Sequence, residues 1–195
     1  VQGVFRQGGL RRGDAQVAGS RTGFSSGAVA DITTDPVIDG GRIYVGSHSG
    51  RTVALDLENG ERLWTAPEGP LNPVWPAGDS IFMVSDRNEL LRLSARDGSR
   101  LWGTPLPLFT SAKPKRQNQI YAHHGPIVAG GRLIVVSNDG QMRTFNPQNG
   151  QLLSQRPLPD GATTNPFVAC NTLYIVSTKG LLMYFRLYKT ALLSR

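Results

Sequence analysis

The stretch Ala54-Leu-Asp56-Leu-Glu-Asn-Gly60-Glu-Arg-Leu-Trp64 indicates the fold, because it reads as a strand, a tight turn and a second strand. Leu55 and Leu57 alternate with Asp56, which is the period-2 pattern of an extended segment with one apolar face. Asn59-Gly60 is a hairpin signal, since both residue types tolerate the positive φ that such turns need. We therefore expect a β-hairpin whose second strand ends on Trp64.

The same layout occurs twice more along the chain. Arg92 to Trp102 repeats it, with Asp97-Gly98 at the turn and Trp102 at the end. Thr144 to Ser154 repeats it with Asn149-Gly150 at the turn, but the Trp is lost. The hairpin is therefore a repeated unit of the fold.

Each hairpin is half of a larger repeat of about 40 residues. A copy begins with a proline and an apolar residue, and continues with an apolar strand, a polar turn and a third strand. The proline pairs are Pro36-Val37, Pro73-Val74, Pro126-Ile127 and Pro166-Phe167. Four short antiparallel strands at this period are typical of a β-propeller, whereas a β-sandwich gives no reason for the same order to recur. We predict an all-β propeller of four-stranded blades, present here as a partial ring.

The repeat also predicts how the chain is divided. Residues 1–30 are expected to be the end of a preceding blade and a linker, and residues 187–195 a C-terminal tail. Four blades are expected between them, at 31–69, 70–122, 123–160 and 161–186. The second blade contains an insertion at 106–120, and the fourth lacks its outer strand.

The two least regular parts of the chain each contribute +3 to the net charge of +7. Residues 1–30 carry four Arg against one acid, and residues 104–122 carry Lys113, Lys115 and Arg116 with none. Residues 31–103 carry seven Arg against eleven acids. Such basic tracts are most often solvated loops, and we expect no nucleic-acid partner.

We expect no catalytic, metal or cofactor site. Cys170 is the only cysteine, which excludes a disulfide within one chain. His123 and His124 point to opposite faces if they lie on a strand, so they are a poor chelate, and we expect one to be packed and the other exposed. Ser85, Ser137 and Ser177 recur at equivalent positions, which indicates repeat structure; the pattern places no His or acid beside them.

The motif from Ala54 to Trp64, Ala-x-Asp-x-x-x-Gly-x-x-x-Trp, resembles the tryptophan-docking repeat of quinoprotein-type propellers. The resemblance implies that Trp64 packs between blades and that the Gly turn fixes the outer hairpin. The docking residues in this sequence are Ala54, Asp56, Gly60, Trp64, Gly98 and Trp102. Such a motif specifies the fold more strongly than the function.

Residues 10–186 as a whole resemble the family of outer-membrane protein assembly factor BamB. The resemblance rests on four segments: Asp31–Val37, Asn72–Gly78, His124–Leu133 and Gly180–Arg186. It implies half of an eight-bladed propeller located in the periplasm, at the inner face of the outer membrane. The family's lipid-bearing cysteine would lie outside this chain, and it would be the only membrane attachment.

The resemblance further implies a non-enzymatic scaffold. Its partners would be the periplasmic domains of the barrel-inserting subunit and unfolded outer-membrane proteins. The family's acidic contact loop corresponds here to Asp31, Ile32, Thr33 and Thr34, with Asp31 keeping the first acid and Thr33 replacing the second. A carboxylate on a rigid loop can pair with a partner's Arg or Lys; the alternative is that Asp31 caps its own turn.

Two other functions remain open on sequence grounds. A generic peptide-binding propeller would use the same scaffold, and the insertion with Lys113, Lys115 and Arg116 is a second contact candidate. A quinoprotein dehydrogenase would need a calcium-bound quinone with converging carboxylate and amide ligands, and no such set is visible in the repeats.

Overall fold

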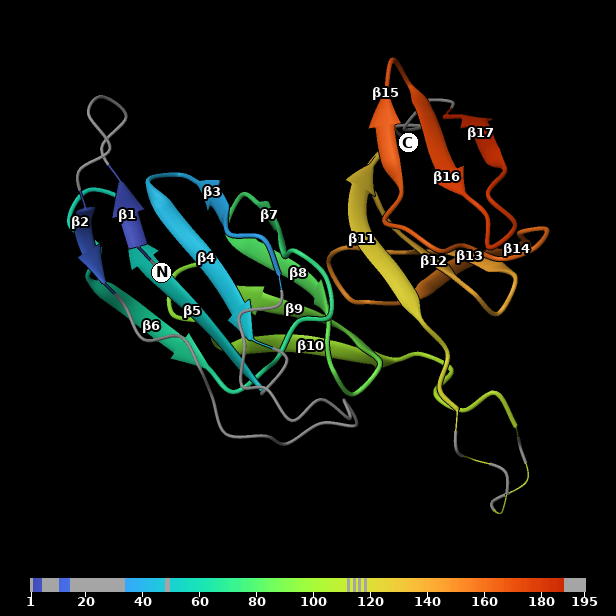
Figure 1. The fold of residues 1–195 in the computed structure, drawn as a ribbon, viewed down its shortest axis with the longest axis horizontal. Helices are drawn as coiled ribbons and strands as arrows, with labels where there is room; N and C mark the ends of the chain where they lie inside the picture. The colour runs from blue at the N-terminus through green and yellow to red at the C-terminus, as the bar shows by residue number, and fades with distance from the viewer. Residues whose placement is uncertain are drawn as a thin grey trace, which may run out of the picture. The chain divides into compact units, whose positions relative to one another are not determined.

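The computed structural model describes residues 2–4, 11–14, 34–47, 50–111, 113, 115, 117 and 119–187 of the chain (Figure 1). The described elements are the strands β1 to β17, which confirms the all-β prediction. The chain divides into two compact units, residues 1–103 and residues 104–195, called unit 1 and unit 2 below.

Unit 1 contains two antiparallel sheets of four strands in chain order, the second ending just past the unit boundary. The first sheet consists of β3 (Val37–Asp39), β4 (Arg42–Ser47), β5 (Arg51–Asp56) and β6 (Arg62–Ala66). The second consists of β7 (Trp75–Ala77), β8 (Ser80–Val84), β9 (Glu89–Ser94) and β10 (Arg100–Pro105). A two-stranded sheet pairs β1 (Gln2–Val4) with β2 (Arg11–Asp14).

Unit 2 contains two further antiparallel sheets. The third sheet consists of β11 (His123–Ala129), β12 (Arg132–Ser137), β13 (Gln141–Phe145) and β14 (Leu152–Pro157). The fourth has three described strands, β15 (Phe167–Ala169), β16 (Thr172–Val176) and β17 (Leu182–Arg186). Ile134, Val136, Leu173 and Ile175 from the second strands form the centre of this unit's core.

One predicted equivalence is wrong by one residue. One residue near the start of each copy pairs with the same position of the next strand: Val37 with Tyr44, Trp75 with Phe82, Ile127 with Ile134, and Phe167 with Tyr174. Trp75, and not Val74, is therefore equivalent to Val37. Val74 is itself buried in the core of unit 1. The pair Pro73-Val74 therefore matches the sequence pattern of the other three copies but does not hold their position in the sheet.

The outer hairpins share one turn, which differs from the predicted one. The N–H of the first turn residue donates to the carbonyl five residues later, at Asp56, Ser94 and Asn146. Gly60 adopts the positive φ, 74°, which suits glycine. Asn59 acts through its side chain, which accepts the Glu61 N–H at 2.8 Å. An Asn or Asp suits this position because its side-chain oxygen accepts a backbone N–H, and not because the residue adopts a positive φ.

The end of β5 also differs from the prediction. The Asp56 carboxylate accepts the N–H groups of Glu58 and Asn59 at 2.8 and 3.0 Å, which turns the chain out of the strand. Leu57 therefore lies in the turn and is 38% exposed, whereas Leu55 is buried. The two leucines do not share a face.

Trp64 docks on the outer turn of the second sheet. Its side chain is 7% exposed, and its indole N–H donates to the Ala95 carbonyl at 3.0 Å. A Cβ on Gly98 would lie 2.6 Å from the Trp64 ring, so only glycine leaves room for it. Ala54 lies opposite Trp64 across β5 and β6 and is fully buried beneath it. Trp102 is half-buried and its ring centroid lies 6.1 Å from that of Phe82.

Candidate partner-binding site

The loop that leads into the first sheet carries the predicted partner-binding residues. Asp31, Ile32 and Thr33 lie outside the described residues, whereas Thr34 is described. Thr34 is 5% exposed, and its hydroxyl donates to the Gly46 carbonyl at 3.4 Å. The Thr34 side chain thus fixes the end of this loop to β4, and its contact with a partner stays a prediction.

The loop between the first two sheets lies against the same end of β4. A Cβ on Gly46 would lie 2.0 Å from Cγ of Pro70 and 3.1 Å from the Thr34 hydroxyl oxygen. A Cβ on Gly69 would lie 2.7 Å from both the Ser47 carbonyl oxygen and the Gly50 nitrogen. In the same loop, the Glu68 carbonyl accepts the Thr52 hydroxyl at 2.6 Å. Both connecting loops therefore rest on Gly46, a residue that the sequence pattern did not single out.

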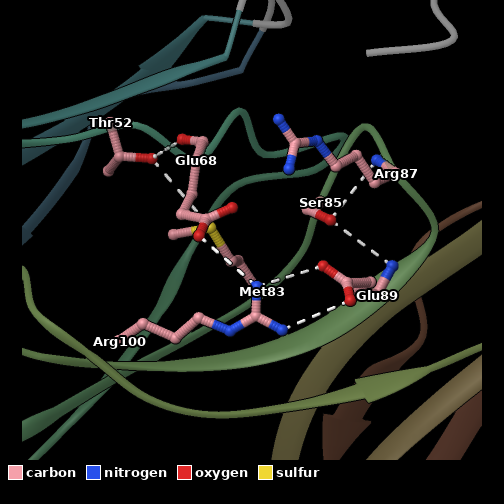
Figure 2. A network of polar contacts seen from close by, with 7 residues as sticks. All are labelled: Thr52, Glu68, Met83, Ser85, Arg87, Glu89 and Arg100. Carbon is pink, nitrogen blue, oxygen red and sulfur yellow. Dashed lines mark hydrogen bonds and ion pairs between the residues drawn. The ribbon is translucent and has the colours of Figure 1, made fainter. Parts of the chain in front are cut away.

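A charged network lies beside this second loop (Figure 2). Arg100 makes two hydrogen bonds of 3.2 Å to the Glu89 carboxylate and lies 3.6 Å from Glu68. The Arg100 side chain crosses Gly103, where a Cβ would collide with the guanidinium. Ser85 caps the neighbouring turn by accepting the N–H groups of Arg87 and Glu89, each at 3.3 Å. The network joins the loop to β9 and β10.

The Glu68 carboxyl is the electrostatically unusual member of this network. Its side chain is 10% exposed, and burial raises its pKa, against the opposing effect of Arg100 and Arg87. Glu89 and Asp86 raise it further, because like charges disfavour a second carboxylate. The Glu68 carboxyl thus lies within the network beside Arg100, which makes it part of the support of this loop.

Unit 2 contains a buried polar cluster that contradicts one expectation. His123 is buried and bonds through Nδ1 to the Ser137 hydroxyl, so a histidine does lie beside this repeated serine. Arg143 donates to Ser137 at 3.3 Å and pairs with Asp139. His123 lies directly opposite Ser137 across β11 and β12. The repeat gave no signal for this contact, because β11 begins at His123, before the proline where the other copies begin.

The cluster is structural and cannot act as a hydrolytic triad. His123 Nε2 donates to the Pro107 carbonyl at 2.8 Å, because a carbonyl can only accept. Nδ1 is then the acceptor, and Ser137 donates to it. Ser137 is completely buried, so no substrate can reach its hydroxyl. His124 is half-buried, not exposed as expected, and burial lowers its pKa as it does that of His123.

The predicted basic contact lies in the insertion, whose Pro107 carbonyl accepts the His123 N–H. Lys113 and Lys115 are exposed, and Arg116 lies outside the described residues. Two pairs of backbone atoms join the two legs of the insertion: Thr110 donates to Gln119 and Tyr121 donates to Leu108. The insertion is thus a narrow ribbon, and the contact of its cations with a partner stays a prediction.

The described residues contain no group of three or more His, Cys, Asp or Glu side chains that could hold a metal ion. They also contain no helix long and apolar enough to cross a bilayer. Cys170 is exposed in the turn between β15 and β16.

Residues 1–104 match the protein family described as outer membrane protein assembly factor BamB. The chain belongs to the BamB family. It is 25% identical over 154 residues to the BamB of Legionella pneumophila (strain Paris), a match that covers 79% of this chain and 37% of that relative. The chain thus spans well under half the length of this relative.

Solved structures confirm that the fold is a β-propeller. BamB from Moraxella catarrhalis matches with a TM-score of 0.65 at 19% identity, over 95% of this chain and 60% of that one. The β-propeller domain of Myceliophteria thermophila Cps50 (Swd1) matches with a TM-score of 0.62 at 11% identity, over 84% and 54%. The BamB family is named for assembly and not for a reaction, which agrees with the prediction that the chain is not an enzyme.

Proposed function

We propose that this chain is part of a non-enzymatic periplasmic scaffold that assists the assembly of outer-membrane proteins. It would bind the periplasmic domains of the barrel-inserting subunit and help to deliver unfolded outer-membrane proteins. The observation that carries the proposal is the family match over residues 1–104, which includes the whole first sheet and the loops at both of its ends.

We further propose that residues 31–34 contact the partner. The support for this proposal is the anchoring of the loop: Thr34 bonds to Gly46, and Pro70 packs on the same glycine. An anchored residue at the end of a contact loop lowers the entropic cost of binding, and a carboxylate at Asp31 would contribute an ion pair to a basic partner surface.

Charge reversal at Asp31 tests the contact. Titration calorimetry with the purified periplasmic domains of the barrel-inserting subunit should show binding about tenfold weaker for Asp31→Arg than for the unmodified chain. Glu58→Arg is the matched control, because it reverses the same charge on an exposed turn of the same sheet and should leave affinity unchanged. Equal affinities for both variants would remove Asp31 from the interface.

A further inference from the structure

The insertion between β10 and β11 is a segment whose architecture the repeat does not account for. Its legs pair through an isolated bridge between Phe109 and Ile120 and through the backbone bonds described above. Leu106 is buried at its base, and the Pro107 carbonyl accepts the His123 N–H. Figure 1 shows the described part of this segment extending away from the sheet of β11 to β14. Long connections held in this way are uncommon and usually functional.

The far end of the ribbon carries positive charge without compensation. Residues 104–122 contain three cations and no acid. Lys113 and Lys115 are exposed, and within the described part of the chain no carboxylate forms an ion pair with either of them. By contrast, Arg143 and Lys179 of the same unit are paired with Asp139 and Asp160. The ribbon therefore presents charge to an external partner.

The composition of the tip favours a membrane surface over a protein. A protein interface needs a central cluster of aromatic or aliphatic anchors around which water is excluded. Residues 110–119 contain Thr, Ser, Ala, Lys, Pro, Arg, Gln and Asn but no aromatic or large aliphatic side chain. An anionic headgroup layer requires only cations on an exposed support, and it attracts each of them without a fixed geometry.

We propose that this ribbon binds the anionic phosphate headgroups of a bilayer surface through Lys113 and Lys115. The contact is independent of the loop at residues 31–34, and it is additional to the lipid anchor that the family resemblance implies. It orients unit 2 at the membrane surface, while His123 and Leu106 keep the base of the ribbon fixed to the third sheet. Salt weakens it, since exposed charges are screened within about 10 Å at 0.1 M ionic strength.

Vesicle binding by the whole chain tests the proposal. Sedimentation with phosphatidylcholine vesicles should carry down little protein, whereas vesicles with about one third phosphatidylglycerol should bind it. The double variant Lys113→Gln/Lys115→Gln should lower the partition coefficient about thirtyfold, because each cation near an anionic surface contributes about fivefold. Arg156→Gln/Arg186→Gln removes the same net charge from exposed positions of β14 and β17, and it should bind nearly as well as the unmodified chain.

Three results would overturn the assignment. Absence of binding to the anionic vesicles would exclude a headgroup site. Equal losses in the two double variants would show a general effect of net charge instead of a site. If the Lys113→Gln/Lys115→Gln variant kept its vesicle binding but lost affinity for the purified periplasmic domains of the barrel-inserting subunit, the ribbon would be a protein contact. The calorimetric result for Asp31→Arg affects none of these outcomes, so the two proposals fail separately.

Discussion

Ser85 and Ser137 lie at the same point of two blades, after the second strand, but they act differently. Ser85 accepts two N–H groups of its own turn, from Arg87 and Glu89. Ser177 does the same for Leu181. In the third sheet Asp139 accepts the turn N–H, from Gln141 at 3.0 Å, and Ser137 bonds to His123 and Arg143 instead. Ser137 is thus the same residue type as Ser85 at the same point of the repeat, but it has a different role because Asp139 caps the turn in its place.

The largest expected effect comes from Asp139, which makes this change of role possible. Asp139→Ala removes the turn cap and leaves Arg143 buried without its carboxylate, so unfolding free energy should fall by about 3 kcal/mol or more. Lys179→Ala is the control, because Lys179 is 70% exposed in its pair with Asp160 and should cost under about 1 kcal/mol. Urea unfolding followed by circular dichroism measures both. Similar losses of unfolding free energy in the two variants would mean that the buried Asp139–Arg143 pair stabilises the fold no more than the exposed Lys179–Asp160 pair.

The two serines provide the next test. Ser137→Ala leaves an acceptor of His123 and a donor of Arg143 in a buried site, and it should cost about 2 kcal/mol. Ser85→Ala removes an acceptor from two turn N–H groups and should cost about 1 kcal/mol. The same unfolding measurement compares them. A greater loss for Ser85→Ala would show that capping, and not the histidine cluster, is the more important role.

The smallest effect is the pH dependence of unit 2. Burial lowers the pKa of His123, Arg143 and His124 lower it further, and the Pro107 carbonyl and Asp139 oppose them. The unfolded chain therefore binds more protons below about pH 6.5, so stability is full above that pH and falls as the pH drops. Hydrogen exchange of β11 and β12 should show about 1 kcal/mol less protection at pH 5.5 than at 7.5.

Two variants separate the histidines in this measurement. His123→Gln should remove most of the pH dependence that is specific to the cluster. His124→Gln should leave most of the His123 contribution in place, because burial is the largest cause of the lowered His123 pKa and His124 is the last of its causes. An unchanged slope in His123→Gln would contradict the assignment of the effect to the cluster.

The repeated parts of the fold were predictable because their signals are local. Gly60 and Gly98 mark the outer turns, and the docking motif identifies Trp64 as a packing residue. The role of Asn59 was not predictable, since asparagine suits both a positive φ and a side-chain acceptor. Val74 was assigned to the wrong register, because an apolar residue after a proline looks the same whether it begins a strand or packs in the core.

The site was less predictable, because it depends on contacts between distant residues. Gly46 gives no pattern of its own, and its importance appears only when Thr34 and Pro70 are seen on either side of it. The His123–Ser137 bond depends on an extended first strand, which the repeat does not contain elsewhere. The contact of Asp31 with a partner is still a prediction, since only the last residue of that loop is described.

The docking of Trp64 also has a consequence for synthesis on the ribosome. Its indole bonds to Ala95, a residue 31 positions later in the chain, and covers Gly98 beyond it. The first sheet therefore emerges with its largest aromatic side chain unburied, and it completes its packing only when the outer turn of the second sheet has left the exit tunnel. We therefore expect the packing of the first sheet to be completed only after the outer turn of the second sheet has been synthesised.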